Sequence, residues 1–270
     1  MTENNLDIEC GVCGIRSKNF EGVCLDCHIE SQSIGMRGHK PIIIVVNGII
    51  AAGKSKYIEM LKTDLTKRGY KVVVVPEPIE KWRETGFFDK YGKNPEIYAF
   101  AFQVQAFVDR VNYNIKAYED HGDQVDIYLL DRSPASDPIF MEAQHAAKYI
   151  DDTMLESYRD WCDLWVKSMP YIPDLFIYLR PSIEETMNRL HKRNRPGEEA
   201  ITLDYQLDLL NRHDKIFGDK EVNIPGVGKR RSITIKNETN YLKSDDNIDR
   251  NTLVKQIEIL YVKVIKERRS

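Results

Sequence analysis

The chain has 270 residues, which is enough for one large hydrophobic core and a small additional module. Its 39 Lys and Arg are outnumbered by 42 Asp and Glu, so no overall positive charge would attract nucleic acid or an anionic membrane without a specific site. The longest apolar run, residues 41–48, is too short to span a membrane, and the polar start MTENNLDIEC lacks the basic and apolar segments of a signal peptide. We therefore expect a cytoplasmic protein in a reducing compartment.

Four of the five cysteines lie near the N-terminus, as CGVC (Cys10 and Cys13) and CLDC (Cys24 and Cys27). Two such pairs are typical of a tetrahedral zinc site, because each pair binds the metal from one turn and the loop between them closes the tetrahedron. We predict that residues 1–38 form a four-cysteine zinc-binding module, which is too small to fold without its metal. Because acidic side chains outnumber basic ones there, the module is expected to be structural or to dock a protein rather than to bind nucleic acid.

Residues 39–270 alternate short apolar runs with longer amphipathic ones, which indicates an α/β domain. The short runs are nearly continuous in Val, Ile, Leu and Tyr, as strands covered on both faces require. The predicted strands are Ile42–Val46, Val72–Pro76, Val125–Leu130, Asp174–Leu179 and Ser232–Lys236. The predicted helical stripes are Tyr57, Leu61 and Leu65, and, near the C-terminus, Leu253, Ile257, Leu260 and Val264. The stretch DKEVNIPGVGKRRS is expected to be a long loop.

The first predicted strand runs directly into GIIAAGKS, residues 48–55, which fits the phosphate-loop pattern G-x-x-x-x-G-K-[ST] and opens the first helical stripe. In such a loop the backbone N–H groups surround the phosphates, Lys54 reaches the β and γ oxygens, and the Ser55 hydroxyl binds Mg²⁺. The pattern therefore predicts a nucleoside triphosphate site. Its phosphate-binding residues would be Gly48, Ala51, Ala52, Gly53, Lys54 and Ser55.

Polar side chains follow two other predicted strands. EPIEKW, after the second strand, contains Glu77 and Trp82, and DRSPASD, after the third, contains Asp131, Arg132 and Asp137. The carboxyl ends of parallel strands meet at one edge of a sheet, which is where such folds bind their ligands. These residues are therefore expected to decide what happens beside the phosphate loop.

Two further groups lie on predicted helices. Gln103 and Arg110 are two helical turns apart and so lie on similar faces. Arg189, Arg193 and Arg195 surround a loop that continues as Pro-Gly-Glu-Glu. The Arg-Pro-Gly sequence in this loop suits a mobile lid. A solvated helix end, favoured by the helix dipole, fits the same arginines.

Together these stretches resemble the deoxyribonucleoside kinases, the family of the deoxycytidine, deoxyguanosine and insect multisubstrate kinases. The resemblance is carried, in family order, by GIIAAGKS, EPIEKW, YGKNPEIYAFAFQ, DRS, YRDWCDLW and RNRPGEEAITLDY. It runs from residue 41 to the C-terminus and leaves the cysteine module outside. It implies an α/β P-loop kinase with a five-stranded parallel sheet flanked by helices, and a homodimer formed through helices.

The reaction implied by the resemblance is transfer of the γ-phosphoryl group of ATP to the 5′-hydroxyl of a deoxyribonucleoside, as in nucleotide salvage. Glu77 would be the general base and Arg132 would hold it. Asp131, where the family more often has Glu, would support Mg²⁺ together with Ser55. The arginines Arg189, Arg193 and Arg195 would join Lys54 on the phosphates.

The resemblance also implies a nucleoside site. Its residues would be Glu77, Trp82, Tyr91, Gln103, Arg110, Asp137, Phe140 and Glu198. Tyr91 and Glu198 would hold the 3′-hydroxyl, with Glu199 as the alternative to Glu198.

The base end of this site would rest on five of these side chains. Gln103 would pair with the base edge, because its amide both donates and accepts. Trp82 and Phe140 would pack against the base faces. Arg110 and Asp137 match a pair that members preferring purines or cytosine keep near the base, so thymidine is expected to be disfavoured.

Three other readings remain open. A nucleoside monophosphate kinase shares the loop and the lid but must bind a second phosphate, which Glu77 would repel. A non-catalytic interaction protein on the same scaffold would dock through the cysteine module, although Lys54, Glu77 and Arg132 are all present. A zinc-dependent nucleic-acid binder with an accessory ATPase would need a basic, aromatic surface around the cysteines.

Overall fold

The computed structural model describes residues 40–169, 172–195, 197–198, 201–225, 227–237 and 248–269, together with four two-residue strands nearer the N-terminus. No helix among the described residues combines the length and the apolar character needed to cross a lipid bilayer.

The four short strands form two antiparallel pairs. They are β1 (Ile8–Glu9) with β2 (Arg16–Ser17), and β3 (Asn19–Phe20) with β4 (Val23–Cys24). Of the four predicted zinc ligands, Cys24 ends β4, whereas Cys10, Cys13 and Cys27 lie outside the described residues. The zinc module, with its boundary at residue 38, therefore stays a prediction.

The central sheet has six strands in the order β6-β7-β5-β8-β10-β9. In chain order these are β5 (Ile42–Asn47), β6 (Val72–Val75), β7 (Ile127–Asp131), β8 (Leu175–Leu179), β9 (Glu221–Ile224) and β10 (Gly228–Ile235). The five parallel strands overlap the five predicted ones. Every residue of β5, β7 and β8 is buried, as the continuous apolar runs predicted.

The expectation of five strands, all parallel, was wrong by one strand. β9 pairs antiparallel with β10 at the sheet edge, inside the stretch expected to be a loop. Val222 and Ile224 are buried while Glu221 and Asn223 are exposed, so EVNI has the alternation of a half-buried strand. In the sequence, EVNI is only four residues long and is followed by Pro-Gly-Val-Gly, a pattern typical of a turn. The strand forms because these residues pack against β10 and α9.

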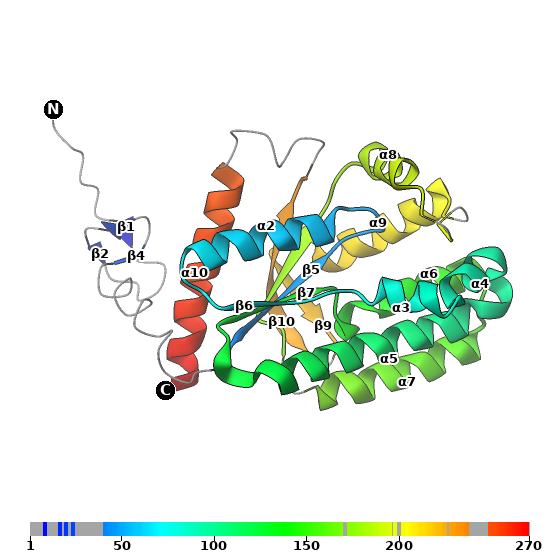
Figure 1. Ribbon diagram of the computed structural model, residues 1–270, viewed down its shortest axis with the longest axis horizontal. Coiled ribbons are helices and arrows are strands. Elements are labelled where there is room, and N and C mark those ends of the chain that lie inside the picture. The colour runs from blue at the N-terminus through cyan, green and yellow to red at the C-terminus, as the bar shows by residue number, and fades with distance from the viewer. Residues whose placement is uncertain are drawn as a thin grey trace.

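Helices cover both faces of the sheet (Figure 1). They are α2 (Lys54–Lys67), α3 (Ile79–Glu84), α4 (Phe87–Lys93), α5 (Pro95–His121), α6 (Pro138–Ala146), α7 (Asp152–Ser168), α8 (Ile183–Arg193), α9 (Leu203–Phe217) and α10 (Ile248–Arg269), with the 3₁₀ turns η1 (Gly122–Gln124) and η2 (Pro134–Ser136). α2 packs on β6 and β7, and α10 packs on α2. α9 packs on β9 and β10, whereas α5, α6 and α7 pack together.

Both predicted helical stripes contribute to the core. Tyr57, Leu61 and Leu65 on α2 are buried, as are Leu253 and Ile257 on α10. They join the strands in one large hydrophobic cluster. This core holds the carboxyl ends of β5, β6 and β7 in register, with Val46 beside Asp131, and so positions the polar residues that follow those strands.

Candidate active site

The phosphate loop follows β5 and is shaped by residues with positive φ. Gly48 has φ of 152°, and a Cβ there would lie 2.7 Å from the carbonyl oxygen of Leu179, so this position requires glycine. Gly53, at φ of 92°, precedes the first turn of α2. The loop is the predicted one, residues 48–55, and it opens a helix whose N-terminus favours a bound anion.

Side chains from distant elements hold the back of this loop. The carbonyl oxygen of Ala52 accepts hydrogen bonds from Asn237 Nδ2 at 2.7 Å and from Arg189 Nη1 at 3.0 Å. The carbonyl oxygen of Ile50 accepts one from Gln206 Nε2 at 2.8 Å. Arg189 was expected to contact phosphates, but it also donates to the carbonyl oxygen of Asn237 and pairs with Glu185. Its guanidinium therefore supports the loop through the Ala52 carbonyl group while the residue also lines the cavity.

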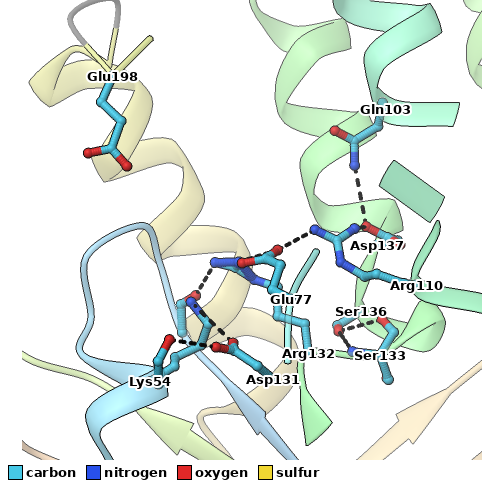
Figure 2. Close-up of polar contacts among 12 residues, drawn as sticks. Lys54, Glu77, Gln103, Arg110, Asp131, Arg132, Ser133, Ser136, Asp137 and Glu198 are labelled. Atoms are coloured by element: carbon cyan, nitrogen blue, oxygen red, sulfur yellow. Dashed lines mark hydrogen bonds and ion pairs between the residues drawn. The ribbon is translucent and has the colours of Figure 1, made fainter. Parts of the chain in front are cut away.

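Lys54 and Ser55 meet Asp131 at the end of β7. The Ser55 hydroxyl donates to Asp131 Oδ2 at 2.9 Å, and Lys54 Nζ lies 3.7 Å from Asp131 Oδ1 (Figure 2). Lys54 is buried. Burial, followed by the nearby charge of Arg132, lowers the pKa of Lys54 to about 8 against the opposing effect of Asp131.

Arg132 connects the phosphate loop to Glu77. Its backbone has φ of 67°, a strained conformation for a non-glycine residue. Its Nη2 donates to the carbonyl oxygen of Gly48 at 2.7 Å, and its Nη1 lies 3.4 Å from Glu77 Oε1. The guanidinium also stands over the ring of Phe140, with 4.4 Å between Cζ and the ring centroid. The Arg132 side chain thus contacts the phosphate loop, the Glu77 carboxylate and the Phe140 ring, and holds the three in fixed positions relative to one another.

Glu77, Arg110, Asp137 and Gln103 form a polar chain that leads away from the phosphate loop (Figure 2). The last three are buried, and the Glu77 side chain is 9% exposed. Arg110 donates through Nη2 to Glu77 Oε1 and through Nη1 to Asp137 Oδ1. Gln103 Nε2 lies 3.4 Å from the same Asp137 oxygen. The two carboxylates are thus held apart by one guanidinium, which is the strongest available partner for both.

The pKa values of the two carboxyl groups move in opposite directions. Burial alone would raise the pKa of Glu77, but the charges of Arg132, Arg110 and Lys54 lower it to about 2. Burial raises the pKa of Asp137, because Arg110 only partly offsets the loss of water there. Glu77 is therefore ionised at neutral pH.

Glu77, Arg110 and Gln103 line one cavity of about 680 Å³ together with Lys54, Asp131 and Arg132. Its far end has aromatic walls: the Tyr91 and Phe102 rings are stacked at 4.8 Å, and Trp82 meets Phe102 edge-on at 5.4 Å. Phe140 lines it as well. The volume and the mixture of apolar walls with a few charged groups suit a small organic ligand bound beside a phosphate site.

The lid arginines lie at the cavity with Glu198. Arg193 forms a two-point ion pair with Glu198, and both line the cavity, as does Arg195. Glu199, the alternative to Glu198, lies outside the described residues. Of the predicted kinase-site residues on the described part of the chain, most line this one cavity. The exceptions are Gly48, Ala52 and Asp137, and Asp137 is hydrogen-bonded to the lining residue Arg110.

Comparison with known proteins decides which family this site belongs to. The family model of the deoxynucleoside kinases matches residues 44–262. The chain belongs to the deoxynucleoside kinase family. It is therefore a kinase, and the resemblance of its motifs to that family is confirmed.

Named relatives of this kinase come from distant organisms. It is 35% identical over 198 residues to a probable deoxycytidine kinase of fowlpox virus, a match that covers 73% of this chain and 80% of the viral protein. It is 31% identical over 196 residues to deoxycytidine kinase 1 of Xenopus laevis, covering 63% and 72%. It is 26% identical over 187 residues to the deoxyadenosine kinase of Dictyostelium discoideum, covering 68% and 70%.

The residues of the kinase fit a magnesium ion beside the phosphate loop. Within the described part of the chain, the buried Asp131 Oδ1 accepts no hydrogen bond, while Oδ2 is held by the Ser55 hydroxyl. A carboxylate oxygen and a hydroxyl are hard oxygen donors of the kind that hold a hydrated Mg²⁺. The described residues contain no cluster of three or more His, Cys, Asp or Glu side chains that could hold a metal by themselves, so the nucleotide phosphates and water would supply the other ligands.

Several side chains at the site were missed by sequence reasoning. They are Asp109, Gln144, Tyr205, Gln206 and Asn237. Gln144 Nε2 donates to the hydroxyl groups of Tyr91 and Tyr205, which ties the predicted sugar-binding tyrosine to α9. A polar residue within an apolar helical stripe could have marked such side chains in the sequence. That pattern does not show which residue the side chain binds.

Proposed function

We propose that this kinase transfers the γ-phosphoryl group of ATP, with Mg²⁺, to the 5′-hydroxyl of a deoxyribonucleoside, as in nucleotide salvage. The observation that carries the proposal is the position of Glu77. Its carboxylate is ionised, lies between Arg110 and Arg132, and faces the cavity beside Lys54. A hydroxyl group bound there would have a proton acceptor on one side and the phosphate loop on the other.

The donor side of the reaction would rest on positioning and charge. Backbone N–H groups of the phosphate loop would hold the β and γ phosphates, with Lys54 beside them. Bound Mg²⁺, held through Ser55 and Asp131, would neutralise phosphate charge. Arg193 and Arg195 would approach the transferring group from the lid. Arg189 would act mainly by keeping the loop in shape, because its donors already bind Ala52 and Asn237.

On the acceptor side, Glu77 would accept the proton of the 5′-hydroxyl as the phosphoryl group transfers. A carboxylate of low pKa is a weak base, but phosphoryl transfer needs little base strength because the nucleophile loses its proton late. Arg132 would hold Glu77 in place and place positive charge near the 5′-oxygen. The hydrogen bond from Arg132 to Gly48 links that charge to the loop itself.

The far end of the cavity would select a purine or cytosine base over thymine. Arg110 is held by two carboxylates, and Gln103 is turned toward one of them (Figure 2). Guanidinium and amide N–H donors fixed in this way suit acceptors on the base edge, whereas the acceptor oxygens of Gln103 and Asp137 suit an exocyclic amino group, which thymine lacks. Trp82 and Phe140 would enclose the base, and Tyr91 and Glu198 would bind the 3′-hydroxyl.

The nearest alternative is a nucleoside monophosphate kinase. Its acceptor would carry a second phosphate group to the place where Glu77 lies, and the described wall there offers an ionised carboxylate. Electrostatic repulsion therefore favours a neutral nucleoside as acceptor. A non-catalytic interaction protein would have no need for the buried set of Lys54, Asp131 and Arg132.

We also propose that two copies associate through α5 and α7. Met154, Trp161, Leu164 and Trp165 are at least 39% exposed on one side of α7, and Ile97 is 66% exposed on α5. The two helices pack against each other and run side by side (Figure 1). Several exposed apolar side chains on adjacent helices are typical of a protein interface.

The zinc module is proposed from spacing alone. Cys10, Cys13, Cys24 and Cys27 would bind one Zn²⁺ and would serve structure or protein docking. The direct test is metal analysis of the purified full chain, which is expected to contain one zinc per chain. A Cys24→Ser, Cys27→Ser variant should lose that zinc, and a wild-type protein free of zinc would contradict the module.

The main test measures phosphate transfer from ATP and Mg²⁺ to each of the four deoxyribonucleosides by wild-type protein and Glu77→Gln. We expect at least one nucleoside to gain a 5′-phosphate and Glu77→Gln to lower kcat by about 100-fold or more while ATP still binds. Glu80→Gln is the matched control, because Glu80 is 72% exposed on the same segment. If the wild type phosphorylates only nucleoside monophosphates, the proposed acceptor is wrong.

A further inference from the structure

Asp109 is a buried acid that no part of the proposed mechanism uses. It lies in the middle of α5, is 1% exposed, and directly precedes Arg110. Its Oδ2 accepts a hydrogen bond from Trp82 Nε1 at 2.9 Å, and its Oδ1 accepts one from Lys81 Nζ at 2.6 Å. Both carboxylate oxygens are therefore directed at α3, the short helix that follows Glu77.

Stability alone is a poor reason for this arrangement. A buried carboxylate loses its hydration, and an apolar side chain of the same size would often serve a core as well or better. The cation that pairs with Asp109 is also half in water, because the Lys81 side chain is 45% exposed. What the carboxylate supplies, and a leucine could not, is a directional acceptor for the indole N–H group.

The orientation of the Trp82 indole matters because the ring forms part of the cavity wall. Trp82 is buried, lines the cavity, and meets the Phe102 ring at 82°. The guanidinium of Arg110 lies 5.3 Å from the indole centroid, so the same ring also borders the charge that would face the base. A hydrogen bond at Nε1 selects one of the ring flips that the aromatic cluster would otherwise tolerate.

Two consecutive residues of α5 thus hold the two ends of one segment. Arg110 binds the carboxylate of Glu77 at the start of the segment, and Asp109 binds Lys81 and Trp82 one turn into α3. Side chains of consecutive helical residues differ in direction by about 100°, which lets one reach the cavity and the other reach α3. Together they fix the position of α3 relative to α5.

We propose that Asp109 is a positioning residue for nucleoside recognition: by holding the Trp82 indole and α3, it sets the wall against which the nucleoside base packs. This role rests on the proposed function, because it names a determinant of the same nucleoside site. Asp109 does not touch the reacting atoms. Its removal should therefore weaken nucleoside binding and leave ATP binding unchanged.

The test compares Asp109→Leu, which removes the acceptor and keeps the branched side-chain shape, with Asp109→Asn, which keeps an oxygen for the indole. Asp109→Leu should raise the nucleoside KM roughly tenfold, the loss expected for one directional hydrogen bond, and Asp109→Asn should stay within about threefold. The ATP KM should not change in either variant. If Asp109→Leu does not fold, Asp109→Ala takes its place with the same expectation.

A matched control is Asp126→Asn. Asp126 is 4% exposed, and its carboxylate accepts hydrogen bonds from the backbone N–H of Lys71 and the hydroxyl of Tyr261. It immediately precedes β7, at the end of the strand away from the cavity. The substitution should lower the thermal midpoint without changing the nucleoside KM. An equal rise in nucleoside KM for Asp126→Asn and Asp109→Leu would overturn the positioning role, since both losses would then follow from destabilisation.

A second readout is independent of catalysis. The chain has three tryptophans, so the ¹⁵N-labelled indole resonance of Trp82 can be assigned with a Trp82→Phe variant. It should move upfield in Asp109→Leu and stay near its wild-type position in Asp109→Asn. If the wild type phosphorylates no nucleoside, the proposed function is wrong. If the wild type is active and Asp109→Leu keeps the wild-type nucleoside KM, only the role of Asp109 is wrong.

Discussion

Arg193 and Glu198 form an ion pair, with Arg193 Nε 3.1 Å from one carboxylate oxygen of Glu198 and Arg193 Nη2 2.5 Å from the other. Family resemblance assigns Arg193 to the phosphates and Glu198 to the sugar, which are opposite ends of the reaction. The pair joins the end of α8 to the segment before α9, and both residues line the cavity. Under these assignments, substrate binding on either side would have to share or open this contact, which would couple the lid to the acceptor.

Glu198→Gln tests that coupling. The substitution removes the charge that holds Arg193 and leaves a weaker partner for the sugar hydroxyl. We expect the nucleoside KM to rise roughly tenfold, and the ATP KM to stay the same or fall because Arg193 is released toward the phosphates. Steady-state kinetics with each substrate varied in turn would measure both. An increase in the ATP KM alone would contradict the assignment. Glu184→Gln, an exposed acid on α8, is the matched variant for comparison.

ATP binding should weaken as the pH rises above 8. Burial and Arg132 lower the pKa of Lys54 to about 8, so its ammonium group loses its proton, and with it the positive charge, as the pH rises through about 8. At pH 9 only about a tenth of it would remain charged, which predicts a Kd for ATP about tenfold higher than at pH 7. Lys54→Arg should bind with little pH dependence between pH 7 and 9, since a guanidinium stays protonated.

The same pKa has a consequence for stability. The pKa of Lys54 in the folded protein lies below its ordinary value of 10.5, so the unfolded chain binds more protons between pH 8 and 10.5. This group alone therefore makes the free energy of unfolding increase with pH across that interval. Urea titrations of wild type and Lys54→Met at pH 7.5 and pH 10 would measure the difference, and an identical pH dependence in both proteins would contradict the shift.

Arg110→Gln should move the acid limb of kcat/KM to higher pH. In the wild type the charges around Glu77 lower its pKa from 4.5 to about 2, so its stabilising interactions are present above about pH 4.5 and are lost as the pH falls toward 2. Without Arg110, less positive charge offsets the burial of Glu77, so the pKa of Glu77 should increase. The acid limb of the kcat/KM profile should then move to higher pH by about one unit or more. Arg83→Gln, paired with Glu80 at the surface, should leave the limb unchanged. An unshifted limb in Arg110→Gln would show that Arg132 and Lys54 are sufficient to keep Glu77 ionised.

A charged side chain on the exposed face of α7 should separate the proposed dimer. Leu164 and Trp165 are 62% and 42% exposed, and Trp165→Glu would place a carboxylate in an apolar interface. Sedimentation velocity should then report a monomer for Trp165→Glu and a dimer for the wild type. Asp163→Lys, on the far side of the helix by its 100° spacing, should leave the dimer intact. A wild type that is monomeric at micromolar concentration would contradict the proposed interface.

Sequence reasoning succeeded where a local pattern is sufficient. The phosphate loop needs glycines and a lysine at set spacing, so it is found from residues 48–55 alone. Three of the five parallel strands, β5, β7 and β8, are continuous buried runs because both of their faces are covered. Glu77, Asp131 and Arg132 were found for a related reason. They directly follow strands, and parallel strands must bring their carboxyl ends to one edge.

The tertiary structure decided which side chains pair. The edge strand β9 forms because β10 and α9 cover it, although four residues before a turn carry little signal of their own. Arg189 binds the Ala52 carbonyl group of the phosphate loop, and Asp109 reaches Trp82 across 27 positions of sequence. Such contacts depend on how helices far apart in the chain pack on the sheet, and a residue type alone does not identify its partner. The sequence by itself therefore determined the phosphate loop, the parallel strands and the carboxylates at their ends, whereas packing alone decided how the lid, the base wall and the loop are held to one another.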